Sequence, residues 1–255
     1  MSEGIEIFFN ALKEKCSNAR GYAAELLKAR GFLLEDKGLI LSDNSHRDDV
    51  TYLRELLKEE NLGKIRVNKI SIHRGANLEK IFYKDNWIGF EVNDGVFLRW
   101  KRFVHDSYVP KFPVRYLEPF VARYVKAINA CAVATCLSCD GNHHGLQYLS
   151  VYCIYPCNIW HEIICKRLLV GRFDLNWRRG YSEIIFDETN KWETYAEVNR
   201  AAEFLYNNRI KIRQIRREAS NGISVSMARH LSDEELEKIF SERANRLFDE
   251  FLKEL

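Results

Sequence analysis

The residues best suited to chemistry lie close together in one short segment, which reads TCLSCDGNHHG from residue 135 to residue 145. The segment holds thiols, a carboxylate and two imidazoles, and it lies between two apolar runs that predict strands. Turns at strand ends are where a rigid scaffold commonly displays functional side chains. The candidate catalytic residues are Cys139, Asp140, His143 and His144.

Two kinds of catalysis fit these residue types. In the first, Cys139 is a thiolate activated by His143 or His144, and Asp140 orients the imidazole. In the second, Asp140 and His143 act as an acid–base pair. The alternative without catalysis is a solvated turn, because Asp-Gly-Asn is a common turn sequence.

A zinc site is a second interpretation of the same region. Cys136 and Cys139 have C-x-x-C spacing, and Cys157, His161 and Cys165 would follow one stripe of a predicted helix. Structural zinc takes four nitrogen or sulfur ligands, and the candidates are Cys136, Cys139, Cys157 and His161. The same helix face equally suits a packed core, because free cysteine is often buried. Zinc is therefore a candidate cofactor, and the cofactor is otherwise unknown.

Basic side chains gather in three other segments. They read RWKR at residues 99–102 and WRRGY at residues 177–181, and the third, residues 209–217, has five cations and no acid. Arginines beside aromatic rings suit phosphate groups and stacked bases, although a run of charge is also typical of a solvated helix face. The candidate phosphate-binding residues are Arg178, Arg179, Arg213, Arg216 and Arg217.

Composition narrows the classes of function. The 255 residues carry 39 Lys and Arg against 36 Asp and Glu, so the formal net charge is only +3. A nearly balanced charge gives no chain-wide nucleic-acid footprint, and an anionic partner must therefore meet a local patch. The sequence contains no phosphate loop, dinucleotide-binding glycine pattern or serine-hydrolase elbow. This disfavours P-loop NTPases, Rossmann enzymes and serine hydrolases.

One short stretch resembles a known motif. Thr135-x-x-Ser138-Cys139-x-Gly141 is similar to a motif of the wybutosine-synthesis tRNA methyltransferase family. The likeness covers seven of the 255 residues, and Asn142 stands where that family carries a basic residue. This resemblance implies RNA modification as one candidate activity of the protein.

Cysteine usage and the first residues predict a cytoplasmic protein. The chain has seven cysteines, and six of them fall between Cys131 and Cys165. An odd, clustered set favours reduced thiols over a disulfide framework. The N-terminus carries acids where a secretory signal needs a basic start, and the least polar run is too short to cross a bilayer. We therefore expect no membrane association.

Hydrophobic periodicity and turn signals predict an α+β fold in three parts. Residues 1–109 are expected to hold helices and then an antiparallel meander. Residues 110–190 are expected to form a two-layer α/β sandwich that carries the Cys/His cluster. Residues 191–255 should be a helical tail packed on the second part. An extended, proline-containing connector around residues 106–113 sets the first boundary.

The individual elements follow from the same signals. In the first part we expect two helices, a hairpin around residues 32–41 and a helix from a Ser45 cap to Asn61. Its strands are predicted at 65–72, 80–83, 87–92 and 96–100. In the second part, helices at 118–129 and 158–169 accompany strands at 132–138, 148–155 and 182–186. The tail carries a capping box, Ser232 with Glu235, before an amphipathic stripe.

These features favour an intracellular protein that binds a nucleotide or RNA at the Cys/Asp/His turn and, in one interpretation, processes it there. The alternative is a non-catalytic subunit of a larger assembly, with a structural Cys/His metal site or simply buried cysteines. The C-terminal helix would then dock a protein partner or a second copy of the chain.

Overall fold

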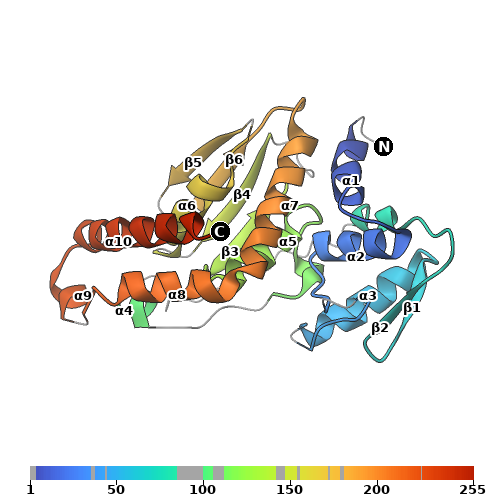
Figure 1. Ribbon diagram of the computed structural model, residues 1–255, viewed down its shortest axis with the longest axis horizontal. Coiled ribbons are helices and arrows are strands. Elements are labelled where there is room, and N and C mark those ends of the chain that lie inside the picture. The colour runs from blue at the N-terminus through green and yellow to red at the C-terminus, as the bar shows by residue number, and fades with distance from the viewer. Residues whose placement is uncertain are drawn as a thin grey trace.

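The centre of the protein, in a computed structural model, is a four-stranded antiparallel sheet in the order β3-β4-β6-β5 (Figure 1). The structure describes residues 4–35, 38–43, 45–84, 100–105, 112–141, 147–153, 156–171, 173–178, 181–224 and 226–255. The four strands are β3 (Thr135–Cys139), β4 (Tyr148–Cys153), β5 (Asp174–Arg178) and β6 (Tyr181–Ile185). With the helices around them, they confirm the predicted α+β class.

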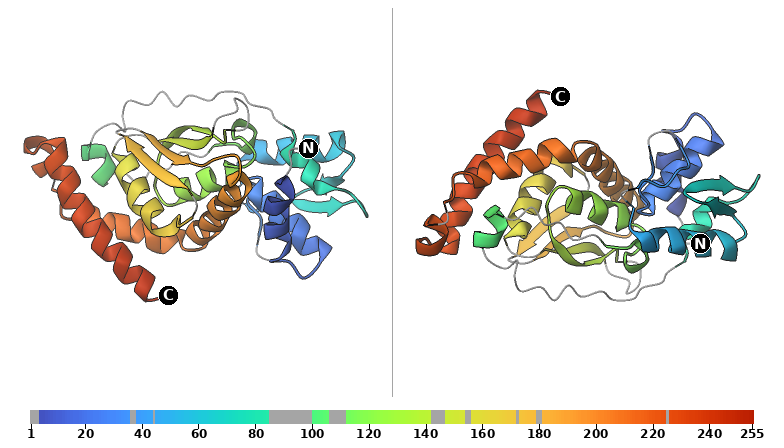
Figure 2. Two further views of the ribbon diagram at one scale, coloured as in Figure 1. Left: turned by 90° about the horizontal axis from the view of Figure 1, so that it is seen from above. Right: turned by 90° about the horizontal axis from the view of Figure 1, so that it is seen from below.

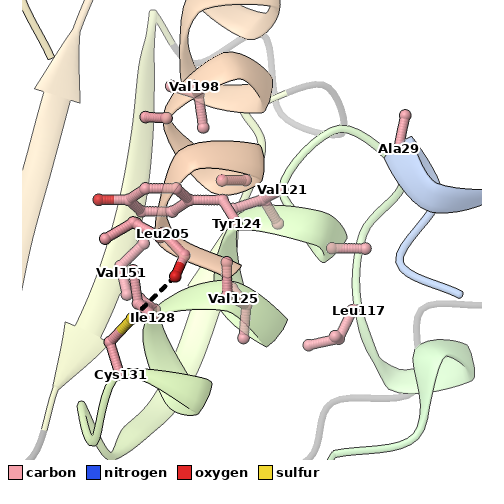
Figure 3. Close-up of a cluster of buried hydrophobic side chains, with 14 of the residues drawn as sticks. Ala29, Leu117, Val121, Tyr124, Val125, Ile128, Cys131, Val151, Val198 and Leu205 are labelled. Atoms are coloured by element: carbon pink, nitrogen blue, oxygen red, sulfur yellow. Dashed lines mark hydrogen bonds between the residues drawn. The ribbon is translucent and has the colours of Figure 1, made fainter. Parts of the chain in front are cut away.

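Helices cover one face of this sheet. Helix α5 (Ala122–Ala130) and helix α6 (Cys157–Leu168) lie against it, and α7 (Lys191–Asn207) packs along α5. Apolar residues at helical spacing make the α5–α7 contact, in which Val125 and Ile128 lie close to Val198 and Leu205 (Figure 3). The Cys131 thiol at the end of α5 donates to the Leu205 carbonyl at 3.5 Å. The two helices thereby form one layer.

No described helix lies on the opposite face of the sheet. Side chains alternate along a strand, so Leu149, Val151 and Ile184 point to the helices while their neighbours point away. We call the second set the outer sheet face. Its members include Leu137, Cys139, Tyr148, Tyr152, Asn176, Arg178, Tyr181 and Glu183. All of these residues are at least partly exposed, whereas Ser150, which pairs with Cys139 and Glu183 on the same face, is buried.

The first part of the chain packs against the far side of the α5–α7 layer (Figures 1 and 2). Its elements are α1 (Ile5–Lys13), α2 (Ala19–Ala29), α3 (Arg47–Glu59), β1 (Gly63–Arg66), β2 (Lys69–Ile72) and the 3₁₀ helix η1 (Leu78–Phe82). Helix α1 lies on α7, and α2 contacts α5. Gly31, just after α2, has φ +98°, and a Cβ there would stand 2.9 Å from the Ala122 Cβ. Glycine therefore permits this close approach of the two parts.

The C-terminal part is helical, as predicted. It comprises α8 (Arg209–Ser220), α9 (Met227–His230) and α10 (Asp233–Lys253), and two short helices, α4 (Trp100–His105) and η3 (Val114–Tyr116), precede the sheet. The capping box of Ser232 and Glu235 is present at the start of α10. Its apolar stripe is buried within this chain, where Phe240 and Phe248 contact Trp160 of α6. Figure 2 shows α10 lying beside α8.

Several predicted elements of the first part are wrong. The strand expected at 65–72 is the β1–β2 hairpin, which turns at Val67 with φ +58°. The strand expected at 80–83 is the 3₁₀ helix η1, and Trp100 begins a helix instead of ending a strand. His46, not Ser45, caps α3, because its Nδ1 accepts from the Asp48 N–H at 3.2 Å.

The remaining predicted helices and strands are partly confirmed. The expected hairpin at 32–41 is reduced to one bridge, between Leu34 and Leu41. Helix α6 and strands β3, β4 and β6 lie close to their predicted positions, but β5 was not predicted. The strand expected at 87–92 and residues 96–99 of the next one lie outside the described residues. No helix in the described part of the chain is both long enough and apolar enough to span a membrane.

Candidate functional site

Two of the candidate catalytic residues lie at the end of β3, where they meet two residues from distant parts of the chain. Asp140 follows β3 directly and is fully buried. Its backbone N–H donates to a Glu118 carboxylate oxygen, and its own carboxylate accepts from the Phe120 N–H at 3.4 Å. The Tyr195 hydroxyl at the start of α7 donates to the Asp140 carbonyl. We call Glu118, Cys139, Asp140 and Tyr195 the β3-end cluster.

The two carboxyls of this cluster cannot both be ionised cheaply. Burial and the neighbouring Asp140 raise the pKa of Glu118 to about 8. This shift favours the protonated form of the Glu118 carboxyl. The two hydrogen bonds between carboxyl and backbone groups also hold the segment before α5 to the end of β3. A protonated, buried carboxylic acid is the chemistry of a general acid.

The surroundings of Cys139 favour the thiol over the thiolate. Burial raises its pKa to about 11, and the carboxyls of Glu118 and Asp140 act in the same direction. The Gly141 N–H donates to its sulfur at 3.3 Å, but this one bond opposes the shift only in part. The described neighbours thus disfavour Cys139 as an activated nucleophile. His143 and His144, the imidazoles predicted to activate it, lie outside the described residues.

The predicted zinc ligands do not form a metal centre in the described part of the structure. No three described His, Cys, Asp or Glu residues are placed to hold one ion. The sulfurs of Cys153 and Cys165 contact opposite nitrogens of His161, at 3.6 Å from Nδ1 and 3.2 Å from Nε2. One ion cannot bind both nitrogens of a single ring. Cys157 is buried beside Ala134, and the side chain of Cys136 is not among the described atoms.

His161 instead belongs to a buried hydrogen-bond network. Its Nδ1 lies 2.8 Å from the Ser182 hydroxyl, which donates to the Val151 carbonyl at 3.2 Å. Nδ1 therefore carries the proton, and Nε2 accepts from the Tyr124 hydroxyl at 2.8 Å. Burial lowers the pKa of His161 to about 3, so the ring is neutral. These bonds satisfy both ring nitrogens, which makes His161 a structural residue of the α5–α6 contact.

The candidate phosphate-binding arginines are dispersed. Arg178 is exposed at the end of β5, with its guanidinium 5.5 Å from the centre of the Tyr181 ring. Arg213 and Arg217 are exposed on α8 and have no acidic partner among the described residues. Arg216 is buried, lies 4.2 Å from the centre of the Phe103 ring and donates to the Phe103 carbonyl. Arg179 lies outside the described residues.

Helix α7 separates the basic helix α8 from the β3-end cluster. Tyr195 near its start bonds Asp140, whereas Leu205 near its end bonds Cys131, whose surroundings include Arg209 and Arg213. Ten residues of α-helix span about 15 Å. The structure therefore does not bring the α8 arginines to the turn at which we expected one common cleft.

Arg178, in contrast, shares the outer sheet face with Cys139. The register pairs Leu137 with Tyr152, Tyr152 with Tyr181, and Tyr181 with Arg178 across four strands. The rings of Tyr152 and Tyr181 are stacked, with their centres 5.3 Å apart. Cys139 is two residues after Leu137 on β3 and lies on the same face. Burial raises the pKa of Tyr152, and neighbouring groups that include Cys139 act in the same direction. Two tyrosines, an arginine and a thiol thus gather on one face of the sheet.

Glu118 and Tyr195 were not among the candidate residues. They lie 22 and 55 residues from Asp140 along the chain, and each contacts it only after folding. The one available signal for Glu118 is its position just before Pro119, at the start of a predicted helix. The tyrosines of β4 carry no local signal beyond a strand pattern.

Comparison with known proteins finds no similarity that could assign a function: no family model, no curated protein and no solved structure matches the chain.

Proposed function

We propose that this protein binds single-stranded RNA on the outer sheet face and acts on it at the β3-end cluster. The observation that carries the proposal is the stacked Tyr152–Tyr181 pair beside Arg178, on the face of the sheet that no described helix covers. Open four-stranded sheets with aromatic side chains are a recurrent way to bind RNA, because unpaired bases stack on the rings.

The neighbouring side chains suit the same ligand. The Arg178 guanidinium can contact a phosphate while it remains over the Tyr181 ring. On the same face, toward the β5 edge, Asn176 donates to Glu183 at 2.9 Å, and both side chains are partly exposed. An amide and a carboxylate in this position offer donors and acceptors to base edges. The formal net charge of only +3 agrees with a partner that meets one local surface.

The processing part of the proposal rests on Glu118. A protonated carboxyl can act as general acid in RNA cleavage: the 2′-hydroxyl attacks the adjacent phosphorus, the bond to the 5′-oxygen breaks, that oxygen takes the Glu118 proton, and the 2′-hydroxyl proton passes to water. Cys139 connects the Glu118 carboxyl to the outer sheet face. Incubation of a defined RNA with the protein should then change the mass of the RNA. Glu118→Gln should abolish that change while it leaves RNA affinity intact. An unchanged RNA mass with the wild-type protein would leave the non-catalytic binding subunit as the function.

The binding test is fluorescence anisotropy with a labelled 12-nucleotide single-stranded RNA. Tyr152→Ala should weaken binding roughly tenfold, since the loss of one stacked base costs about 1–3 kcal/mol. Arg178→Gln should weaken binding and reduce the slope of log affinity against log salt by about 0.7, as expected for one lost phosphate contact.

Two controls separate the outer sheet face from other surfaces. Tyr83→Ala removes a tyrosine that is 48% exposed but lies outside the sheet, and it should leave the affinity unchanged. Arg213→Gln with Arg217→Gln removes the exposed charges of α8. If the α8 variant abolishes binding while Tyr152→Ala has no effect, RNA binds along α8 and the outer sheet face is not the site.

A further inference from the structure

A pocket of about 530 Å³ lies on the other side of the α5–α7 layer, away from the outer sheet face. Its walls are the chain after α2 (residues 31–35), Arg123 and Lys126 of α5, and the end of α7 with Arg209. The volume falls within the range of about 300–1,000 Å³ that is typical of small-molecule sites. The pocket thus lies between the first and second parts of the chain.

Positive charge dominates the pocket lining. Four cations, Lys28, Arg123, Lys126 and Arg209, face two carboxylates, Glu35 and Glu203. Two of these cations are held in place and largely withdrawn from water. The Arg123 and Lys126 side chains are each only 12% exposed, and they pair with Glu25 at 3.4 Å and Asp49 at 2.8 Å.

Arg123 keeps donors available for a ligand. Both of its hydrogen bonds, to Glu25 and to Asn199 at 3.1 Å, come from Nη1. Its Nε and Nη2 donors have no acceptor among the described residues. A guanidinium fixed on one side, with N–H groups to spare on the other, is preorganised for a doubly charged oxyanion.

We propose that this pocket binds a phosphate monoester of mononucleotide size. The phosphate lies at Lys28, Arg123 and Lys126, and the organic part lies toward the Tyr206 side chain. The site is independent of RNA binding on the outer sheet face, because α5 and α7 separate the two surfaces.

Two further observations agree with this assignment. Burial raises the pKa of Glu203, but the hydrogen bond from Lys15 and the nearby charges of Arg123 and Lys28 lower it overall, so the Glu203 carboxylate stays charged beside these cations. The Arg209 guanidinium lies 4.3 Å from the centre of the Tyr206 ring and donates to the Tyr206 carbonyl at 2.6 Å. This stacking fixes the aromatic wall. Lys15 occupies Oε2 of Glu203, so Oε1 is the atom that faces a hydroxyl or amino group of the ligand.

The experiment is isothermal titration of the full chain with adenosine 5′-monophosphate, with adenosine and inorganic phosphate as separate probes. We expect the monophosphate to bind, inorganic phosphate to bind more weakly, and adenosine to give no heat. Arg123→Gln should weaken binding of the monophosphate roughly tenfold, the scale of one lost charged hydrogen bond. Arg209→Gln should weaken it less, because it only loosens the Tyr206 wall. Arg246→Gln, which changes an exposed arginine of α10 outside the pocket, should have no effect.

Three results would overturn the proposal. They are no binding of either phosphate compound, binding of adenosine as strong as that of the monophosphate, and loss of binding in Arg178→Gln but not in Arg123→Gln. The last result would place the monophosphate on the outer sheet face. The two proposals are distinguishable because Tyr152→Ala should weaken RNA binding without changing affinity for the monophosphate.

Discussion

Glu118 and Asp140 share a buried site that only one negative charge can occupy comfortably. Each carboxyl accepts a backbone N–H from the other's segment, so the pair joins the chain before α5 to the end of β3. The same burial raises the pKa of Glu118 to about 8. The Glu118 proton therefore stabilises the fold and is the same proton that the proposed general acid would donate.

This proton makes stability fall as pH rises. The folded-state pKa of Glu118 lies above its ordinary value of 4.5, so its stabilising effect is complete below about pH 4.5 and is lost as pH rises through about 8. Between these values, the free energy of unfolding should fall by up to about 1.4 kcal/mol per pH unit from this one group. Glu118→Gln mimics the protonated acid and should remove this slope.

The measurement is urea unfolding of the wild type and Glu118→Gln from pH 5 to pH 9. Glu193→Gln is a control, because Glu193 is an exposed acid in the first turn of α7. Parallel pH profiles for the wild type and Glu118→Gln would contradict a protonated Glu118.

At this scale the sequence identifies part of the site. Cys139 and Asp140 stand out because a thiol and a carboxylate occur together in a turn signal. Glu118 and Tyr195 do not, because their contacts with Asp140 depend on how α5 and α7 pack. Likewise, the spacing of His161 and Cys165 allows a ligand stripe, but the two sulfurs nearest the ring lie at its opposite nitrogens.

At the scale of elements, sequence signals predict a helix or strand correctly where tertiary packing favours the same structure. The capping box at Ser232 and the apolar stripe after it are both present in α10. The hairpin of β1 and β2 shows the opposite case. In residues 65–72, β-branched residues at 65, 67, 70 and 72 favour one strand, and Asn68 is a residue whose type favours a turn. The turn at Val67 and Asn68 forms because the two halves pair with each other, and Val67 adopts φ +58° as a result.

The turn at Val67 should be a weak point of the hairpin. A β-branched residue is strained in the left-handed region, and Val67 is 89% exposed, so it gains little from packing. Val67→Gly should therefore raise the free energy of unfolding by about 1 kcal/mol, since glycine adopts this conformation without that cost.

Chemical denaturation checks this prediction, with Val170→Gly as the matched control. Val170 is also exposed, at 78%, but it is not among the residues with positive φ. There, glycine only adds freedom to the unfolded chain and should lower stability. Equal losses in both variants would show that the Val67 backbone is not strained.

At the scale of the whole molecule, charged groups of the first part find partners in the second. Asp49 of α3 is fully buried, and its carboxylate accepts from the Val114 N–H at 2.6 Å and from Lys126 at 2.8 Å. The buried Arg30 guanidinium donates to the Leu117 carbonyl at 3.3 Å. One continuous apolar core also runs through both parts. The boundary predicted near residue 109 is thus crossed by contacts that neither part can replace alone.

We therefore expect the chain to unfold in one cooperative transition, despite its length. Near-ultraviolet and far-ultraviolet circular dichroism should give the same midpoint in urea, because separation of the parts would expose the shared core and break the pairs of Asp49 and Arg30.

Asp49→Ala should lower stability by about 3–5 kcal/mol, the cost of leaving a buried partner unpaired, and should shift both signals together. Asp48→Ala, next to it and 39% exposed, should cost far less. If instead the two signals separate, or Asp49→Ala moves only one of them, the parts are independent folding units and the predicted division near residue 109 is correct.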